Sequence, residues 1–261
     1  MFMYWNYIED FEEFSAGYRD VVIETMLCVR GELPLWQWHR QRFAQTLAAL
    51  DWGAVPPGLW EAVETAVKRP DSRKARKVRW LTGKKRDGID WSLQFLELLP
   101  RPAGIVLTRT ACIPETERAG MLKSRNNLQA VRELRQPGSM EAGTDILLCD
   151  AGGYCLETTI ANIFIIRENR IITPPLRHNM VPGVMRRYLL EKQSRNNYEI
   201  IEKNIHFARD LLTADGVFVT NAVSGIMPVS RVLEKPLDTT LAEAFKLIID
   251  TELKIGNTIW R

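Results

Sequence analysis

The sequence is poor in the residues that usually hold metals. Its 261 residues include only three widely separated histidines: His39, His178 and His206. Four cysteines are scattered through the chain without a CxxC pair: Cys28, Cys112, Cys149 and Cys155. The absence of an HExxH motif and of any Cys/His cluster argues against a zinc site, so no metal is expected. The cysteines are expected to be buried free thiols in a reducing compartment.

Long apolar runs and a strong charge imbalance are also absent. No run of about 18 apolar residues occurs, so no membrane span and no membrane partner are expected. The first residues, MFMYWNYIEDFEEF, lack the basic start and apolar centre of a secretory signal, which indicates a cytoplasmic protein. The net charge of +3 is too small to indicate a polyanion partner by itself.

The composition that is present suits a globular protein of two lobes. Hydrophobic residues make up 46% of the chain and charged residues 26%. Domains of about 100–150 residues are common, so 261 residues suit two of them. We expect an α/β lobe over residues 1–112, a linker at 113–122 (IPETERAGML) and a second lobe over 123–261.

The first lobe is expected to alternate strands and helices. The stretch 21–36 predicts two strands around a turn at RGE, and the apolar spacing after it predicts a helix ending near Gly53. A second helix is expected over 57–68. The basic stretch 68–88 holds ten Lys or Arg and predicts either a solvated β-hairpin turning at KKRDG or a nucleic-acid patch. The hairpin is favoured because Trp80 is its only stacking aromatic.

The second lobe is expected to be richer in strands. A helix is predicted over 124–136, and 145–176 predicts three or four antiparallel strands with turns at DAGG and REN. Pro182 and Gly183 mark the start of another helix. The stretch 215–229 predicts a strand, a small-residue loop and a short strand, and an amphipathic helix ends the lobe.

Three features could carry chemistry. Lys123, in LKSRNNLQAVREL, is either a solvated charge or the amine of a Schiff base. Glu157 lies among apolar and small residues, so it either faces outward from an edge strand or pairs with a buried cation. The first backbone N–H groups of a helix at PGVMRR could bind an anion. A pyridoxal phosphate enzyme needs such a set together, but the residues alone do not select Lys123 over the other lysines.

The order and spacing of the motifs resemble those of the fold-type IV pyridoxal phosphate enzymes, the class IV aminotransferase family. LKSRNNLQAV resembles the lysine segment of the family, with Asn126 at its usual asparagine, and GYCLETTIANIF resembles its G-x-x-x-E-x-x-x-x-N-x-F strand pair. The resemblance implies that Lys123 is the catalytic Schiff-base residue and that Glu157 pairs with the pyridine nitrogen of pyridoxal 5′-phosphate.

The resemblance also implies how the cofactor phosphate is held. WHRQRF resembles H-x-x-R-L, whose arginine is Arg42 here, and ITPPLRHNMVPGVMRR resembles the segment whose helix amides bind phosphate. TNAVSGIMPV resembles the second phosphate and substrate loop. The implied cofactor-binding residues, beside Lys123 and Glu157, are Arg42, Gly183, Val184, Met185, Asn221 and Ala222.

The fold implied by the resemblance is that of D-amino acid aminotransferase, with an N-terminal α/β sandwich and a C-terminal pseudo-barrel. The cofactor should lie between the lobes, and a homodimer partner should help to close the site. The chain departs from the family pattern in two places. RDVVIET lacks the glycines of the usual GDG motif and has Ile23 in place of an aromatic residue, and Arg125 replaces an apolar residue. No substrate-carboxylate arginine can be located in 73–86.

Two reactions on a small amino substrate share an opening in which the Lys123 amine removes the α-proton. The loop TNAVSGIMPV and the short chain favour a lyase that converts aminodeoxychorismate to 4-aminobenzoate and pyruvate. The alternative is an amino acid aminotransferase acting on branched-chain or D-amino acids. A third hypothesis is a binding protein that has lost activity and uses the basic segment as its contact surface.

Overall fold

The computed structural model describes residues 9–68, 74–86, 88–112, 122–135, 141–191, 194–195 and 197–255. These residues form two compact units. The first contains the described residues up to Pro100 together with Lys123–Asn126, and the second contains the rest of the described chain from Arg101 onward. Each unit is described by itself. No helix in the described ranges is long and apolar enough to cross a membrane.

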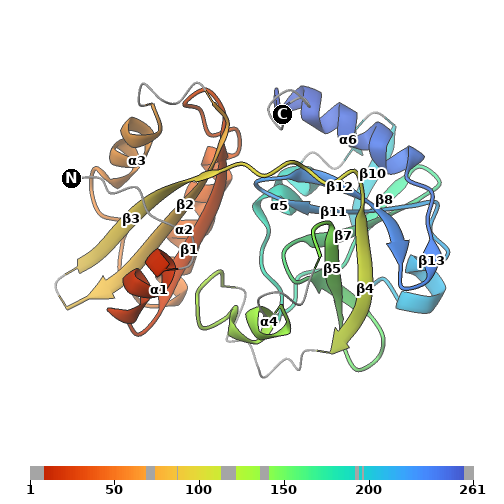
Figure 1. The fold of residues 1–261 in the computed structure, drawn as a ribbon, viewed down its shortest axis with the longest axis horizontal. Helices are drawn as coiled ribbons and strands as arrows, with labels where there is room; N and C mark the ends of the chain where they lie inside the picture. Colours follow the sequence, from red (N-terminus) through yellow and green to blue (C-terminus); the bar gives the residue numbers. More distant parts are fainter. Residues whose placement is uncertain are drawn as a thin grey trace. The chain divides into compact units, whose positions relative to one another are not determined.

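The first unit is a three-stranded antiparallel sheet with helices (Figure 1). Its strands, in the spatial order β1-β2-β3, are β1 (Val21–Cys28), β2 (Arg76–Lys85) and β3 (Gly88–Glu97). Its helices are α1 (Glu9–Ala16), α2 (Trp36–Ala49) and α3 (Leu59–Val67). The predicted basic hairpin is confirmed, since β2 and β3 pair from Arg76↔Glu97 to Lys85↔Gly88.

Aromatic side chains fill the core of this unit. Trp80 of β2 is fully buried, and its ring stacks on Phe43 of α2 at a centroid distance of 4.1 Å. Trp60 of α3 meets both rings edge-on. Buried aromatic rings in such offset and edge-to-face pairs stabilise a core beyond their area alone. Trp80 therefore packs α2 and α3 against the sheet instead of serving as a nucleic-acid stacking platform.

The second unit is dominated by one sheet of ten strands (Figure 1). Its strands are β4 (Ile105–Cys112), β5 (Thr144–Cys149), β6 (Cys155–Thr158), β7 (Asn162–Arg167), β8 (Arg170–Thr173), β9 (Ser194–Arg195), β10 (Tyr198–Glu202), β11 (Gly216–Asn221), β12 (Gly225–Val232) and β13 (Lys235–Pro236). Its helices are α4 (Gln129–Leu134), α5 (Val184–Glu191), a π-helix (Phe207–Leu211) and α6 (Thr240–Glu252).

Six of these strands close into a barrel. The spatial order runs β11-β12-β4-β5-β6-β7, and β7 pairs again with β11. Aliphatic residues fill the interior, for example Leu107 of β4, Ile163 of β7 and Val219 of β11. The predicted pseudo-barrel is therefore confirmed, as is the two-lobed fold class with its antiparallel strands over 145–176.

Two predicted elements are wrong. The second strand expected after RGE does not form, because Trp36 already begins α2 and only the isolated bridge Val29↔Glu32 follows β1. The helix expected over 124–136 shrinks to α4, which begins at Gln129.

The backbone around Lys123 explains the shorter helix. The Lys123 carbonyl accepts from Ile23 N at 2.9 Å, Arg125 N donates to the Val21 carbonyl at 2.8 Å, and Ser124 forms an antiparallel bridge with Val22. A backbone that pairs with the edge of β1 cannot make helical hydrogen bonds at the same time. This pairing is also why Lys123–Asn126 belong to the first unit although the boundary was expected before Lys123. The described residues include only Leu122 of the expected linker.

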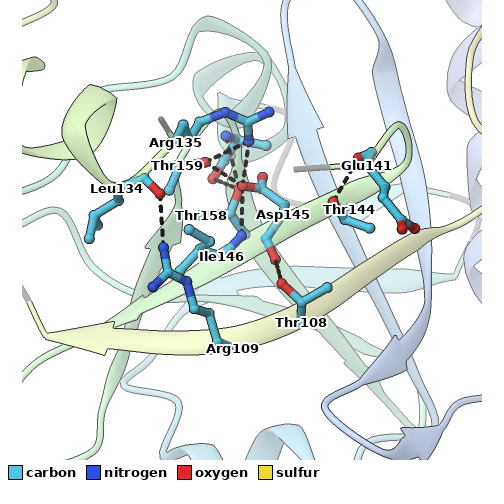
Figure 2. A network of polar contacts seen from close by, with 11 residues as sticks. Thr108, Arg109, Leu134, Arg135, Glu141, Thr144, Asp145, Ile146, Thr158 and Thr159 are labelled. Carbon is cyan, nitrogen blue, oxygen red and sulfur yellow. Dashed lines mark hydrogen bonds and ion pairs between the residues drawn. The ribbon is translucent and has the colours of Figure 1, made fainter. Parts of the chain in front are cut away.

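A buried carboxylate organises the start of β5 in the second unit (Figure 2). Asp145 is 1% exposed, and its Oδ1 accepts from Ile146 N at 2.8 Å and from Arg135 Nη1 at 3.0 Å. Thr159 donates its hydroxyl to the same oxygen and also accepts from Arg135. Because Thr159 follows β6 directly, this network fixes the turn that joins β6 to β7.

Replacing Asp145 with alanine should destabilise the second unit. The change leaves the buried Ile146 amide without its side-chain acceptor, which costs about 1–3 kcal/mol, and the partly exposed Arg135 guanidinium keeps only Thr159 of its two acceptors in this network. We expect Asp145→Ala to lower the midpoint of urea unfolding clearly. The exposed Glu141→Ala serves as the matched control and should stay within about 0.5 kcal/mol of wild type. Equal midpoints for both variants would contradict this account of the network.

Candidate active site

A buried carboxylate, an arginine and a histidine contact one another between β1 and α2 in the first unit. Glu24 of β1 is 1% exposed, and Arg42 of α2 grips its carboxylate with two bonds, Nε to Oε1 at 2.8 Å and Nη2 to Oε2 at 2.5 Å. His39, three residues before Arg42 on the same helix face, places Nδ1 2.6 Å from Oε2. The bidentate geometry fixes the plane of the guanidinium.

The charge states of this cluster follow from its partners. Burial acts to raise the pKa of Glu24, but the charge and hydrogen bonds of Arg42, together with His39, outweigh it and hold this pKa well below its usual range. Burial lowers the pKa of His39 despite the opposing effect of Glu24. An ionised carboxylate only accepts, so the neutral imidazole carries its proton on Nδ1. His39 Nε2 is then a buried acceptor with no hydrogen-bond partner among the described residues.

Lys123 has the electrostatic surroundings of a reactive amine. The residue as a whole is half-buried, but its amine is buried, and burial followed by the charge of Arg42 lowers the pKa of Lys123 to about 7. Lys77 and Arg79 of β2 act in the same direction, whereas Glu24 opposes them. A desolvated lysine beside other cations is largely neutral above pH 7 and is therefore nucleophilic.

The assignment of Arg42 as a phosphate ligand stays a prediction. Its Nε and Nη2 groups are held by Glu24, so a phosphate would meet a guanidinium that is already oriented and partly neutralised. Arg42 was predicted, whereas Glu24 and the role of His39 were not. One signal for Glu24 was a carboxylate in the strand VVIETMLC, because a buried acid requires a basic partner.

In the second unit, Glu157 is a buried acid on a central strand. It is 4% exposed, and β6 pairs with β5 on one side and β7 on the other, which excludes the outward-facing edge-strand alternative. Its carboxylate accepts from Val181 N, at 3.0 Å to Oε2, and from Asn162 Nδ2 at 3.1 Å. Such donors favour the ionised form of a buried carboxylate.

Glu157 belongs to a row of polar residues that crosses three strands. It lies opposite Asn162 of β7, which in turn lies opposite Thr220 of β11. The Thr220 hydroxyl is buried and has no hydrogen-bond partner within the described part of the chain. Asn162 is the asparagine of the motif G-x-x-x-E-x-x-x-x-N-x-F, and Thr220 is the first residue of TNAVSGIMPV, but neither was assigned to the site. The pairing of β7 with β11, which puts Thr220 into the row, joins strands that are distant in sequence and cannot be read from local sequence.

The helix α5 begins beside this row, and Gly183 makes the close approach possible. A side chain at Gly183 would place its Cβ 1.8 Å from Asn162 Oδ1. The amide of Asn162 also donates to the Val181 carbonyl at 3.2 Å and so holds the chain just before the helix. No acidic residue lies in the first turn, so the N–H groups of Gly183, Val184 and Met185 keep the anion-binding character of a helix start.

The loop after β11 is held by its own asparagine. Asn221 Oδ1 accepts from Val223 N at 3.0 Å and from Ser224 N at 2.7 Å. The side chain of Asn221 therefore shapes the turn, which leaves the backbone of Asn221 and Ala222 as the part that could contact a ligand. Because Asn221 follows Thr220 directly, this loop starts from the same row as Glu157 and Asn162.

The structure thus groups the predicted residues into two sets, one in each unit. Lys123 and Arg42 share the first unit with Glu24 and His39, and Glu157 shares the second with the start of α5 and the loop at Asn221. Within the described residues, no group of three or more His, Cys, Asp or Glu side chains is placed to hold a metal ion.

The sequence matches the model of the amino-transferase class IV family over residues 21–232. The chain belongs to this family. The range runs from the first residue of β1 to the last residue of β12, so it contains both sets of site residues. The family predicted from the motifs is confirmed.

Individual relatives support the family assignment, and they align with this chain over different lengths. The aminodeoxychorismate lyase of Vibrio harveyi is 27% identical over 84% of this chain and 85% of its own length. A probable branched-chain-amino-acid aminotransferase of Thermotoga maritima is 27% identical over 39% of this chain and 40% of its own length. Among solved structures, a hypothetical aminotransferase from Mycobacterium tuberculosis in a PLP-bound form shares the fold with a TM-score of 0.78. It is 18% identical and the match covers 96% of this chain and 94% of that one.

The low pKa of Lys123 predicts its reactivity. Its amine should react with acetic anhydride in proportion to the neutral fraction, rising through pH 7, whereas ordinary lysines respond near pH 10.4. We expect trace labelling of the protein without cofactor, followed by peptide mass spectrometry, to give this profile for Lys123. The exposed Lys254 serves as the internal standard. A Lys123 profile that parallels that of Lys254 would contradict the low pKa.

The close approach of Asn162 to Gly183 predicts that a side chain at position 183 lowers stability. Gly183→Ala should destabilise the second unit by about 1–3 kcal/mol, the usual effect of overpacking. The matched control is Gly17→Ala, whose new Cβ would have its nearest neighbour at 3.7 Å. Thermal unfolding should show a lower midpoint for Gly183→Ala only. Adding Asn162→Ala to Gly183→Ala should restore part of the loss, and no recovery would contradict the proposed clash.

Proposed function

We propose that this protein is a pyridoxal phosphate-dependent lyase that converts aminodeoxychorismate to 4-aminobenzoate and pyruvate. The enzyme class and the cofactor follow from the family match. The observation that carries the choice of reaction is the lyase relative, which aligns over 84% of this chain and 85% of its own length. The aminotransferase relative from Thermotoga maritima aligns over 40% of its length.

The residues present fit pyridoxal phosphate. When bound, this cofactor supplies an aldehyde that condenses with amines and a protonated ring that accepts electrons from the substrate α-carbon. The chain offers a buried amine at Lys123, a buried acid at Glu157 and a helix start free of acidic residues at α5. His39 Nε2 and Thr220 Oγ1, which have no hydrogen-bond partner among the residues that the structure describes, are further buried polar atoms that a ligand could satisfy.

Each residue has a defined task in this proposal. Glu157, which accepts hydrogen bonds from Val181 N and Asn162 Nδ2, would hold the proton on the ring nitrogen of the cofactor. The amides at the start of α5, with Arg42 and the loop at Asn221–Ala222, bind its phosphate.

Lys123 moves the protons of the reaction. Its neutral Nζ takes the proton from the substrate carbon that bears the amine, and a pKa of about 7 suits a base that works near neutral pH. Loss of this proton lets the C–O bond to the enolpyruvyl group break, which makes the ring aromatic. Lys123 then returns the proton to the departing group, which leaves as pyruvate.

An amino acid aminotransferase remains the alternative, because branched-chain aminotransferases are also among the relatives. A homodimer and a cytoplasmic location in folate biosynthesis belong to this proposal and rest on the family resemblance and the sequence.

The reaction can be decided by product analysis. The holoenzyme is expected to release pyruvate from aminodeoxychorismate and to form no keto acid from leucine or D-alanine. Borohydride reduction and peptide mapping should place the pyridoxyl group on Lys123, and Lys123→Ala should lose turnover by several orders of magnitude. Lys254→Ala is the control and should keep wild-type rates.

Each other outcome changes the conclusion. A pyridoxyl group on Lys123 with keto-acid formation only would establish the aminotransferase. A pyridoxyl group on another lysine would overturn the assignment of Lys123. No adduct after addition of pyridoxal phosphate would favour the binding-protein hypothesis, which the presence of Lys123, Arg42 and Glu157 together argues against.

A further inference from the structure

Three of the four cysteines lie in one row across neighbouring strands of the barrel. Cys112 of β4 is the register partner of Cys149 on the parallel strand β5, and Cys149 is the register partner of Cys155 on the antiparallel strand β6, just after a register shift at Leu148. Residues opposite each other on paired strands point to the same face of a sheet. The fourth cysteine, Cys28, belongs to the core of the other unit.

Exposure differs along the row. Cys112 is exposed at the end of its strand, Cys149 is 8% exposed and Cys155 is 1% exposed. All three are free thiols. The row therefore leads from solvent into the barrel interior, where Cys149 and Cys155 pack in the same aliphatic cluster.

The two buried thiols are neighbours in the barrel. Cys149 and Cys155 are partners in the register of β5 and β6, and both pack in the same aliphatic cluster. Each thiol of the row therefore has the next one across a single pair of strands.

We propose that Cys112, Cys149 and Cys155 form a thiol–disulfide exchange site for low-molecular-weight disulfides, which ends in a Cys149–Cys155 disulfide. The Cys112 thiolate attacks a disulfide RSSR, which forms a mixed disulfide and releases one RSH. Cys149 attacks the Cys112 sulfur and releases the second RSH. Cys155 then attacks the Cys149 sulfur, which returns Cys112 to the thiol. Each proton lost by an attacking thiol goes to the departing thiolate, so two protein thiols are oxidised and one RSSR is reduced.

The strand geometry permits these bonds and makes them reversible. Opposite residues have Cα atoms about 4.5–5.5 Å apart in antiparallel pairs, and paired strands lie about 4.8 Å apart. Both spacings fall within the range of about 4.4–6.8 Å that a disulfide spans. A bond between directly opposite strand residues is constrained by the backbone, and strained disulfides are the labile ones. The bond would act on β6, which carries Glu157 two residues after Cys155.

Glutathione disulfide is the probe for the test. The native protein is incubated with it, the remaining thiols are alkylated after unfolding, and tryptic peptides are analysed without reduction. No Lys or Arg lies between Gln136 and Ile166, so Cys149 and Cys155 share one peptide, whereas Cys112 lies in TACIPETER. We expect the peptide that contains Cys149 and Cys155 to be two hydrogen atoms lighter than its reduced form and to carry no alkyl group. Treatment with reduced glutathione before alkylation should reverse this change.

Variants separate the three roles. Cys112→Ser should lose the rapid oxidation by glutathione disulfide. Cys155→Ser should stop at a bond between Cys112 and Cys149, which joins the two peptides, and if it fails to fold, Cys155→Ala replaces it. Cys28→Ser is the control and should oxidise like wild type. Glutathione held on Cys112 with both other thiols alkylated would overturn the proposal, as would unchanged oxidation of Cys112→Ser.

Discussion

The buried pair of Glu24 and Arg42 is the interaction on which the first unit of this enzyme depends. It joins β1 to α2, and it lies next to the strand edge that holds Lys123. Burial alone would protonate Glu24, and only the bidentate guanidinium keeps it charged. The charge of Arg42 contributes to the low pKa of Lys123, while Glu24 limits the effect. The same pair thus fixes the packing and sets the electrostatic field at the reactive amine.

The second unit also buries a carboxylate. Glu157 accepts from a backbone amide and from the side-chain amide of Asn162. Such donors stabilise the negative charge of a carboxylate without neutralising it, which is what the proposed pairing with a protonated ring nitrogen requires. Asn162 also touches the position of Gly183, and it therefore links the acid to the start of α5. The two carboxylates differ in their partners, since Glu24 is held by Arg42 and His39, whereas Glu157 accepts from amide groups.

Much of this arrangement could be predicted from sequence, and the exceptions share one cause. Period and turn signals gave the strands from β5 to β8, and Pro-Gly gave the start of α5. The family motifs pointed to Lys123 and Glu157. The helix expected at 124–136 was wrong because Ser124 pairs with Val22, about a hundred positions earlier in the chain. Glu24 and the place of Thr220 in the polar row were missed for the same reason. Their roles depend on partners from other strands and helices, which local patterns do not contain.

The two departures from the family pattern are in contact with each other and are best understood as one change. Arg125, where the family often has an apolar residue, donates to the carbonyls of Ser15, Tyr18 and Arg19 at 2.7–3.0 Å. Arg19 and Asp20 begin the stretch that lacks the family's glycines, and Asp20 accepts from Asn126 N at 3.0 Å. Five hydrogen bonds, including one from Asn126 Nδ2 to the Arg19 carbonyl, therefore hold the residues just after Lys123. These bonds join the residues after Lys123 to the segment that precedes β1. Together with the backbone pairing of Ser124 and Val22, they hold Lys123 beside β1.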